Sequence, residues 1–447
     1  MSVVMKFGGT SVADAAAFEN VARIVANERD AAPIVVVSAM GGVTDSLLSA
    51  TNITSLEKVF ERHRAVAREL LDSSQAAAFI DRLHEAADQI ASLLAQKPAE
   101  HKSLQDAVVS FGETLSSTLL AQVLSQKGIK ARQVDARHCI ITDEEHTSAT
   151  PLMAETFAHS KSELVPVLES AVVPVLGGFI GSTKQGVTTT LGRGGSDYTA
   201  ALIGAALGVR EIQIWTDVTG VLTADPRVVR EAQTVERLSY GEAAELAYFG
   251  AKVLHPKTIQ PAIEHAIPVR ICNSRAPQEP GTLVGPETET SPRTVKAIAH
   301  KTGVTTVQIS SARMLGAYGF LRALFEVFDR HRTVVDVVTT SEVSVSLSLD
   351  DASALPAIVA ELEQLGTVRV EKGRAIICVV GEGLRGTPGI AARVFSTISD
   401  INVTLISQGA SSINFTFAIE EERVKEAVTR LHEEFFRHNE AHKAQTE

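Results

Sequence analysis

The feature that most constrains the fold is the alternation of short apolar segments with helical segments between residues 2 and 274. Residues 2–7 and 33–40 form continuous apolar runs, which are typical of strands buried on both faces of a sheet. Residues 15–27 between them have helical periodicity. The alternation predicts an α/β fold, with a central, mostly parallel sheet sandwiched by helices. The other predicted elements are a helical insertion or hairpin over 57–96, helices near 104–127, 151–169, 196–207 and 241–248, and strands at 131–136, 172–181, 211–217 and 267–274.

A stretch rich in proline and glycine follows this alternation and predicts a linker at 286–298, after a catalytic domain at 1–285. An internal repeat comes next. Gly319 and Gly389 each precede a predicted helix, an apolar strand, a small polar turn and an alternating strand. The repeat predicts two small α+β domains, at 299–374 and 375–447, which form a paired regulatory module.

The charge and the cysteine content exclude several classes of protein. The formal net charge is −11, which argues against a general binder of nucleic acid or of membrane surfaces. The three cysteines are far apart, without a disulfide framework or zinc spacing, as in a reducing compartment. We find no secretory signal and no apolar run of about 18 residues. We therefore expect a cytoplasmic protein without a metal site, a membrane span or a nucleic-acid partner.

The first glycine-rich loop, KFGGTS at 6–11, directly follows the first predicted strand. Gly8 and Gly9 allow the backbone N–H groups to approach a ligand closely, and Lys6 supplies a cation, as phosphate binding requires. A tight turn beside a surface lysine explains the same residues equally well. The chain has no G-x-x-x-x-G-K-[ST] motif, which excludes a P-loop protein, and no convincing G-x-G-x-x-G motif after a strand.

The second glycine-rich loop lies at 188–204, where three glycines surround Arg193, and Ser196 and Asp197 open a helix. An arginine can form a fork onto a carboxylate, and an anion is favourable at a helix N-terminus. Asp197 could instead only cap the helix. This set of residues exceeds what a cap needs, so the loop favours a ligand site.

Other candidates are ambiguous when taken alone. The loop at 214–227 could hold a nucleotide or form a turn without a ligand. Lys252 could be a solvated lysine, and Glu113 a carboxylate on a helix surface. His138 and His255 have no second metal ligand at a useful spacing, so we expect both to be structural.

Taken together, these stretches resemble the aspartokinase (aspartate kinase) family of the amino-acid kinase superfamily, in its monofunctional, lysine-sensitive type. The repeat resembles the tandem ACT domains that follow the kinase domain in this family. The matching stretches, in the family's order, are KFGGTSV (6–12), VVSAMGGVTD (36–45), SFGETLSS (110–117), GGFIGS (177–182), TTTLGRGGSDYTA (188–200), IWTDVTGVLTADPR (214–227), FGAKVLHP (249–256) and TSEVSVSLSLD (340–350).

The resemblance implies transfer of the ATP γ-phosphoryl group to the β-carboxylate of L-aspartate, the first step toward lysine, threonine and methionine. ATP is then a co-substrate that brings Mg²⁺, and no tightly bound prosthetic group is implied. The family often carries an aromatic residue at the position of Leu222, where stacking on the nucleotide is therefore in question. The implied site residues are Lys6, Gly8, Gly9 and Asp197 for catalysis, Thr44, Glu113, Arg193 and Ser196 for aspartate, and Thr216, Asp217, Asp225, Arg227 and Lys252 for the nucleotide.

The resemblance also implies feedback control by an amino acid that binds between two chains, and hence a homodimer or a dimer of dimers. Lysine is the commonest effector of this layout. Ala317 and Val334 replace serines found in some lysine-sensitive relatives, which leaves threonine open. The implied effector residues are Met314, Gly319, Phe320, Leu321, Val335, Asp336, Thr340, Ser341 and Glu342.

Two other functions compete with this interpretation. One is a related kinase that acts on glutamate or on a nucleoside monophosphate, against which SFGETLSS and the tandem repeat argue. The other is an amino-acid sensor without catalysis, against which the intact set of Lys6, Arg193, Asp197 and Lys252 argues.

Overall fold

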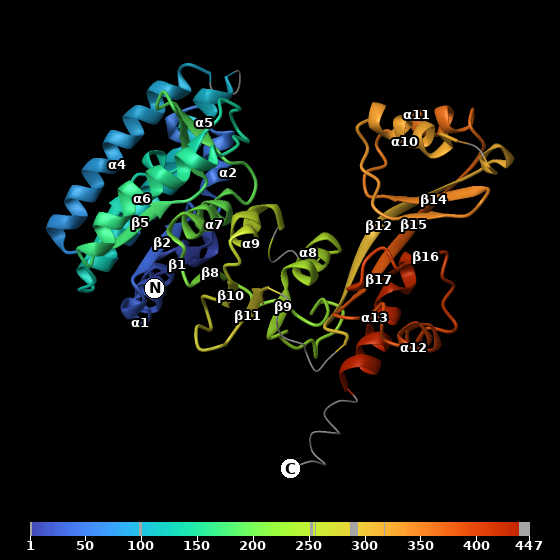
Figure 1. The fold of residues 1–447 in the computed structure, drawn as a ribbon. Helices are drawn as coiled ribbons and strands as arrows, with labels where there is room; N and C mark the ends of the chain where they lie inside the picture. Colours follow the sequence, from blue (N-terminus) through green and yellow to red (C-terminus); the bar gives the residue numbers. More distant parts are fainter. Residues whose placement is uncertain are drawn as a thin grey trace, which may run out of the picture. The chain divides into compact units, whose positions relative to one another are not determined.

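The computed structural model describes residues 2–97, 101–250, 254, 256–286, 294–316 and 318–437. The chain forms two compact units (Figure 1). Unit 1 consists of Met1–Val221, Glu236–Tyr240 and Val253–Glu287. Unit 2 consists of Leu222–Val235, Gly241–Lys252 and Thr288–Glu447. The predicted Lys252 and His255, and also Ala317, lie outside the described residues.

Unit 1 is built on an eight-stranded sheet in the order β3-β5-β2-β1-β8-β10-β11-β9, in which only the β10–β11 pair is antiparallel. Lys6 in β1 stands opposite Val36 in β2 and Ile214 in β8. The loops after β2, β1 and β8 therefore leave the same edge of the sheet. The strands are β1 Val3–Phe7, β2 Pro33–Val37, β3 Ala131–Val134, β5 Val173–Gly177, β8 Glu211–Thr216, β9 Arg237–Ser239, β10 Val269–Asn273 and β11 Thr282–Gly285.

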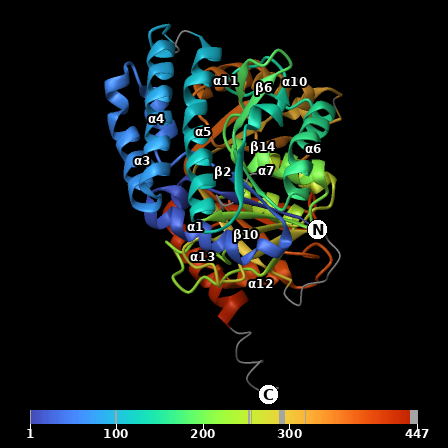
Figure 2. The same cartoon turned by 90° about the vertical axis from the view of Figure 1, so that its left-hand side faces the viewer.

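Helices pack against both faces of this sheet, so the predicted α/β sandwich is confirmed. The helices α6, α7 and α9 form one packed group, while α1 and α5 belong to a second group with the α3–α4 hairpin outside them. Figure 2 shows α3, α4 and α5 side by side. The helices are α1 Ala15–Asn27, α2 Val43–Ser49, α3 Glu57–Leu70, α4 Ser73–Leu94, α5 Lys102–Gln126, α6 Met153–Glu169, α7 Gly195–Leu207 and α9 Gln260–Glu264.

The predicted strand at 172–181 is in fact two strands that belong to different sheets. β5 ends at Gly177, and Phe179 adopts a positive φ of 67°, which redirects the chain into β6. β6 pairs with β4 and β7 in a second, three-stranded sheet. Its strands are β4 Ile141–Thr142, β6 Ile180–Thr183 and β7 Thr188–Thr190.

α5 is the central helix of unit 1. By length and apolar composition alone this helix could cross a membrane, but 78% of its most apolar 18-residue stretch is buried inside the structure. It packs on β5 and β3 and against α4, and Glu113 and Asp106 on it are buried as well. These contacts are those of a core helix.

Two glycines at the end of β5 allow helices to approach the edge of the sheet. A Cβ on Gly177 would lie 2.9 Å from the Cβ of Glu113 in α5. A Cβ on Gly178 would lie 2.7 Å from the Cα of Ser196 in α7. Both contacts are shorter than any side chain tolerates, so these positions require glycine.

Unit 2 is built on a six-stranded antiparallel sheet in the order β13-β14-β12-β15-β17-β16. Its edge strands β13 and β16 meet, since Thr339 Oγ1 donates to the Ile406 carbonyl at 3.2 Å. The strands are β12 Ala297–Ser310, β13 Val338–Thr340, β14 Ser344–Leu349, β15 Thr367–Val380, β16 Leu405–Gln408 and β17 Asn414–Glu420. The helices are α8 Tyr240–Tyr248, α10 Phe320–Arg330, α11 Leu355–Leu362, α12 Ile390–Thr397 and α13 Val424–His432, which continues as a π-helical turn, Glu433–Arg437.

The predicted repeat is present, because Gly319 and Gly389 both cap a helix, α10 and α12, with φ of 83° and 86°. The two repeats share strands, whereas the predicted domain ranges 299–374 and 375–447 follow one another along the chain without overlap. Residues 305–310 of β12 pair with β14, while residues 297–301 of the same strand pair with the end of β15. Ile298 accordingly shares a hydrophobic core with Ile377, Phe415 and their neighbours from the second repeat.

The catalytic range predicted at 1–285 also differs from the packing. Thr223 Oγ1 lies 2.8 Å from His432 Nε2 of α13, and its carbonyl accepts from the Ile298 N–H. Glu242 of α8 forms a fully buried ion pair with Lys296 at 2.7 Å. These contacts hold residues 222–235 and 241–250 to unit 2.

The predicted linker at 286–298 is wrong at its end, since residues 295–298 are buried and β12 begins at Ala297.

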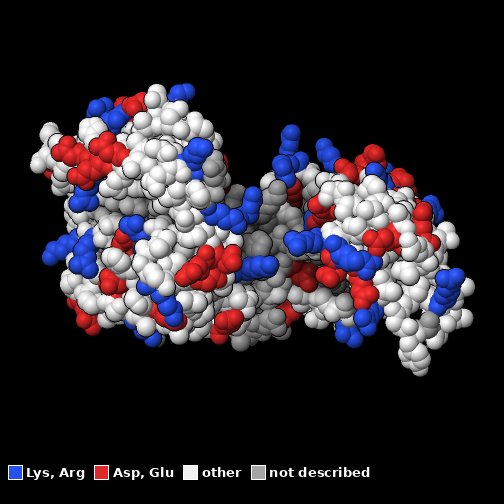
Figure 3. Space-filling model, turned by 90° about the horizontal axis from the view of Figure 1, so that it is seen from above, with Lys and Arg blue, Asp and Glu red and all other residues white. Residues whose placement is uncertain are grey.

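Charged side chains of both signs are interspersed on the face that Figure 3 shows. The formal net charge of −11 is therefore not gathered in one patch on that face.

The approach of α7 to the sheet edge generates a prediction. Gly178→Ala should lower the free energy of unfolding of unit 1 by about 1–3 kcal/mol, because its methyl group would overlap Ser196. Urea denaturation followed by the fluorescence of Trp215, the only tryptophan and a residue of unit 1, measures this change. Gly285→Ala is the matched control, since its Cβ would meet no atom of the described residues within 4 Å. Equal midpoints for both variants would contradict the steric argument.

Candidate functional site

A cavity of about 660 Å³ lies in unit 1 at the carboxyl ends of β1, β2 and β5. Ligands bind at this edge in open α/β sheets. The cavity brings together many of the residues singled out from the sequence. Its lining includes Lys6, Gly9, Thr44, Glu113, Arg193, Ser196 and Asp197.

The centre of the cavity is an ion pair between Lys6 at the end of β1 and Asp197 in the first turn of α7. Lys6 Nζ lies 2.7 Å from Asp197 Oδ1, and the two side chains are only 12% and 18% exposed. α7 begins after Gly194, which has a φ of 75°. Asp197 therefore does not act only as a cap, because it fixes the position of the Lys6 ammonium.

The two glycines after β1 have different contacts, and only Gly8 departs from the expectation. The Gly8 N–H donates to the Trp215 carbonyl at 3.1 Å, so it is used inside the sheet and is not available to a ligand. The expectation that Gly8 donates to a phosphate is therefore wrong. Gly9 lines the cavity, and a Cβ there would lie 2.9 Å from the Ala39 carbonyl, so the loops after β1 and β2 pack closely.

Glu113 is a buried carboxylate that faces the cavity from α5. It is 3% exposed, and no hydrogen-bond donor among the described residues reaches its Oε2. Burial raises the pKa of Glu113 to about 8, although a hydrogen bond with the Ala39 backbone partly offsets the shift. An unpaired buried carboxylate of this kind is suited to receive a cation.

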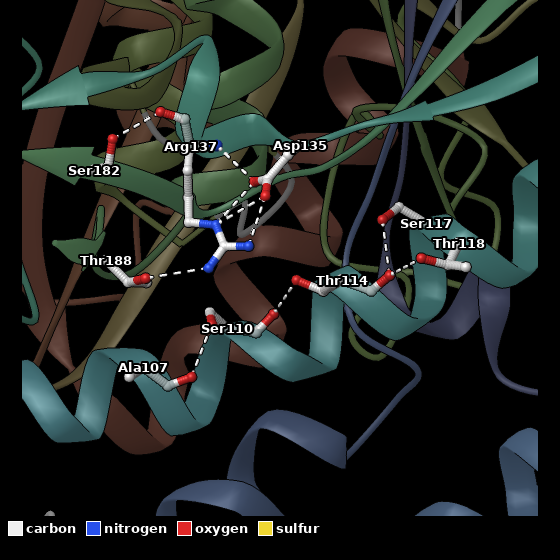
Figure 4. Close-up of polar contacts among 9 residues, drawn as sticks. All are labelled: Ala107, Ser110, Thr114, Ser117, Thr118, Asp135, Arg137, Ser182 and Thr188. Carbon is white, nitrogen blue, oxygen red and sulfur yellow. Dashed lines mark hydrogen bonds and ion pairs between the residues drawn. The ribbon is translucent and has the colours of Figure 1, made fainter. Parts of the chain in front are cut away.

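Two of its neighbours on α5, Ser110 and Thr114, have their hydroxyl groups satisfied within the helix. Ser110 donates to the Ala107 carbonyl, and Thr114 to the Ser110 carbonyl (Figure 4). Figure 4 also shows Arg137 forked onto Asp135, at 2.6 Å for the shortest contact. These groups are satisfied within the fold, which separates them from Glu113.

Arg193 is the exposed cation of the cavity and lies in the turn before α7. Ser196 beside it is buried and accepts from Ser38 Oγ at 3.1 Å, which ties the start of α7 to the loop after β2. Thr44 is in the first turn of α2, the helix to which the loop after β2 leads. The cavity thus offers a cation, a carboxylate and hydroxyl groups around one space.

The candidate nucleotide residues fall on both units. Thr216 ends β8, beside the strand that carries Lys6, and Asp217 follows it in unit 1. Asp225 and Arg227 belong to unit 2, where the Arg227 side chain is 87% exposed and its guanidinium forms a fork onto Asp225 at 2.6 Å.

The candidate effector residues all lie in unit 2, around α10 and β13. Asp336 follows α10, and its carboxylate accepts a hydrogen bond from the Tyr248 hydroxyl of α8. In the part of the chain that the structure describes, no hydrogen-bond donor reaches its Oδ2. Burial raises the pKa of Asp336 to about 6. Ser341 shapes the turn after β13, while Glu342 is exposed.

Sequence reasoning missed Asp106, Thr147, Phe179 and Thr190, which also line the cavity. A signal for Asp106 was available. It precedes Glu113 by seven residues, and this spacing places both carboxylates on one face of a helix. The other three residues depend on loop geometry, which carries no comparable pattern.

Comparisons with known proteins agree with this geometry. Residues 1–273 match the amino acid kinase family, and residues 377–435 match an ACT domain. Aspartokinase 1, chloroplastic, of Arabidopsis thaliana is 39% identical over 462 residues, which cover 98% of this chain and 80% of that protein.

Two crystal structures of E. coli aspartokinase III are also similar, each at 36% identity. The complex with aspartate and ADP (R-state) has a TM-score of 0.82 over 98% of this chain and 100% of that chain. The complex with lysine and aspartate (T-state) has a TM-score of 0.81 over 97% and 99%. The predicted amino-acid kinase fold with ACT domains is thereby confirmed, and the chain belongs to the aspartokinase family of kinases.

Proposed function

We propose that the enzyme transfers the γ-phosphoryl group of ATP to the β-carboxylate of L-aspartate and so begins the synthesis of lysine, threonine and methionine. The observation that carries this proposal is the Lys6–Asp197 pair at 2.7 Å, set in one cavity with Arg193 and Glu113. The solved relative in complex with aspartate and ADP supports aspartate and an adenine nucleotide as the ligands.

Lys6 would act on the charge problem of this reaction. The attacking carboxylate and the phosphoryl donor are both anions, so the enzyme must neutralise charge and hold the two in line. Lys6 supplies the positive charge, and Asp197 holds its ammonium in place. An ionised carboxylate needs no general base, so the chemistry asks only for positioning and electrostatic stabilisation.

Mg²⁺ would arrive with the nucleotide. Among the described residues there is no group of three or more His, Cys, Asp or Glu side chains placed to hold a metal ion. Mg²⁺ commonly binds through substrate phosphates with only one or two carboxylates. Asp197 is the carboxylate suited to that part, and the ion would supply neutralisation of phosphate charge.

Aspartate would be held by its two α-substituents. Arg193 can form a fork onto the α-carboxylate, and Glu113 can receive the ammonium group. Thr44 and Ser196 would add hydroxyl contacts. The nucleotide would be held by Thr216, Asp217, Asp225, Arg227 and Lys252, as the family resemblance implies.

We further propose feedback inhibition by lysine, with threonine as the second candidate. The solved relative in complex with lysine and aspartate supports this assignment. The unpartnered Oδ2 of Asp336 suits an ammonium group, and the Tyr248 hydroxyl already occupies Oδ1. An effector that bound both oxygens would have to displace Tyr248.

A homodimer, or a dimer of dimers, through unit 2 is the assembly we propose. Leu321 and Phe325 lie one turn apart on α10 and are 41% and 36% exposed. Val334 and Val338 nearby are 72% and 38% exposed. A second copy would cover this apolar surface.

We also propose a cytoplasmic location, because Cys139, Cys272 and Cys378 are all free and buried.

The catalytic proposal predicts that Lys6→Ala lowers kcat by at least about 10²-fold, because the charge at the phosphoryl group is lost. A coupled ATPase assay at saturating aspartate measures this. Lys184→Ala is the matched control, since Lys184 is an exposed lysine of unit 1 whose ammonium group pairs with Glu155. An unchanged kcat in Lys6→Ala would remove Lys6 from the phosphoryl site.

The raised pKa of Glu113 predicts a pH dependence of aspartate binding. Because the pKa of Glu113 is about 8, its side chain is neutral in the empty site at lower pH. An ammonium group needs the ionised form of this carboxyl group. The KM for aspartate should therefore fall several-fold as pH rises from about 7 to about 8.5. Glu113→Gln should have a high KM that does not change with pH. A flat profile in the wild-type enzyme would count against the ammonium contact.

The regulatory proposal predicts that lysine inhibits and that Asp336→Ala relieves inhibition while turnover remains. Tyr248→Phe should be inhibited at lower lysine concentrations, because no hydroxyl competes for Asp336. Activity titrated with lysine and, separately, with threonine measures both effects. Asp351→Ala, an exposed carboxylate of the same unit, is the control. Inhibition by threonine alone would refute the choice of effector.

A further inference from the structure

Asp106 is a completely buried carboxylate that lines the cavity from α5. Both of its oxygens are engaged. Oδ1 accepts from Thr190 Oγ1 at 2.5 Å, and the Thr147 N–H lies 3.2 Å from Oδ1 and 3.0 Å from Oδ2. His146 Nδ1 lies 2.9 Å from Oδ2. One side chain thus holds two segments, the 146–147 loop and the end of β7.

Thr147 is held in a conformation that it would not adopt alone. Its φ is 72°, in the left-handed region that β-branched residues strongly disfavour. Such a backbone persists only where its surroundings fix it. The Asp106 carboxylate accepts a hydrogen bond from the Thr147 N–H, so Asp106 holds the Thr147 backbone in this conformation.

The two segments lead directly to Arg193. The Ala149 N–H donates to the Thr190 carbonyl at 2.9 Å. Gly192 packs on Thr147 so closely that a Cβ would lie 3.3 Å from the Thr147 carbonyl oxygen. Arg193 is the next residue, so its place in the cavity depends on contacts that Asp106 holds.

α5 also carries Glu113, about 10 Å further along the helix axis. We propose that Asp106 is a positioning residue that sets the placement of Arg193 relative to Glu113, and thereby the fit of the cavity to a short dicarboxylic amino acid. This inference rests on the proposed roles of Arg193 and Glu113 in binding aspartate. Asp106 itself bonds only to protein groups and does not touch the substrate in this account.

The test compares KM values for the two substrates. Asp106→Asn should raise the KM for aspartate about tenfold or more, since charge-assisted hydrogen bonds to both segments are weakened. The KM for ATP should stay unchanged. Thr190→Val should raise the KM for aspartate as well, and Thr190→Ser, which keeps the hydroxyl group, should restore it.

Asp143→Asn is the matched control. Asp143 accepts from the Thr150 and Glu145 N–H groups within the same loop, at 2.9 and 3.2 Å, but does not reach α5. The KM of the Asp143→Asn variant for aspartate should match that of the wild-type enzyme. If Asp106→Asn does not fold, the Thr190→Val and Thr190→Ser pair decides the question.

Arg193→Ala, measured in parallel, separates the two proposals. An unchanged KM for aspartate in Arg193→Ala would overturn the proposed role of Arg193. A raised KM in Arg193→Ala with a wild-type KM in Asp106→Asn and Thr190→Val would overturn only the positioning role of Asp106. Equal rises in the KM for aspartate and for ATP, or failure of Thr190→Ser to restore the KM, would also overturn it.

Discussion

The structure of unit 1 depends on placing a lysine at the end of a buried strand within 2.7 Å of a carboxylate at the start of a helix. Lys6 emerges where β1 leaves the sheet, and Asp197 is presented by the first turn of α7. Charges that are mostly buried are costly unless they are paired, so each residue requires the other. The proposed chemistry, in which one anion attacks another, uses the same positive charge.

Close backbone approach makes this arrangement possible. Gly177 admits α5 with Glu113, and Gly178 admits α7 with Ser196, to the end of one strand. Gly9 admits the loop after β2 to the loop after β1. Gly9, which the sequence placed in a candidate phosphate loop, therefore serves as a contact between elements, as Gly177 and Gly178 do, while charged side chains line the space that remains.

The sequence predicted the order of strands and helices in unit 1 well, because buried parallel strands such as 33–37 are continuous apolar runs. It also predicted Lys6, Arg193 and Asp197 as partners in one site. It did not predict that Gly8 bonds to Trp215 or that Asp106 faces the cavity. Those facts depend on the register between strands and on loop geometry, which residue types alone do not specify.

The boundaries were harder to predict for a related reason. β12 and β15 each contribute residues to the hydrophobic cores of both repeats, and the segment around Thr223 packs on α13, so residues distant in sequence share one core. Composition marks where proline and glycine gather, but it does not indicate which strand a segment will join.

The most direct test of the central claim is a hydroxamate assay, which traps an acyl phosphate, with ATP and each of aspartate, glutamate and UMP as the acceptor. The account predicts hydroxamate formation with aspartate and none with the other two. Turnover with glutamate and none with aspartate would contradict it.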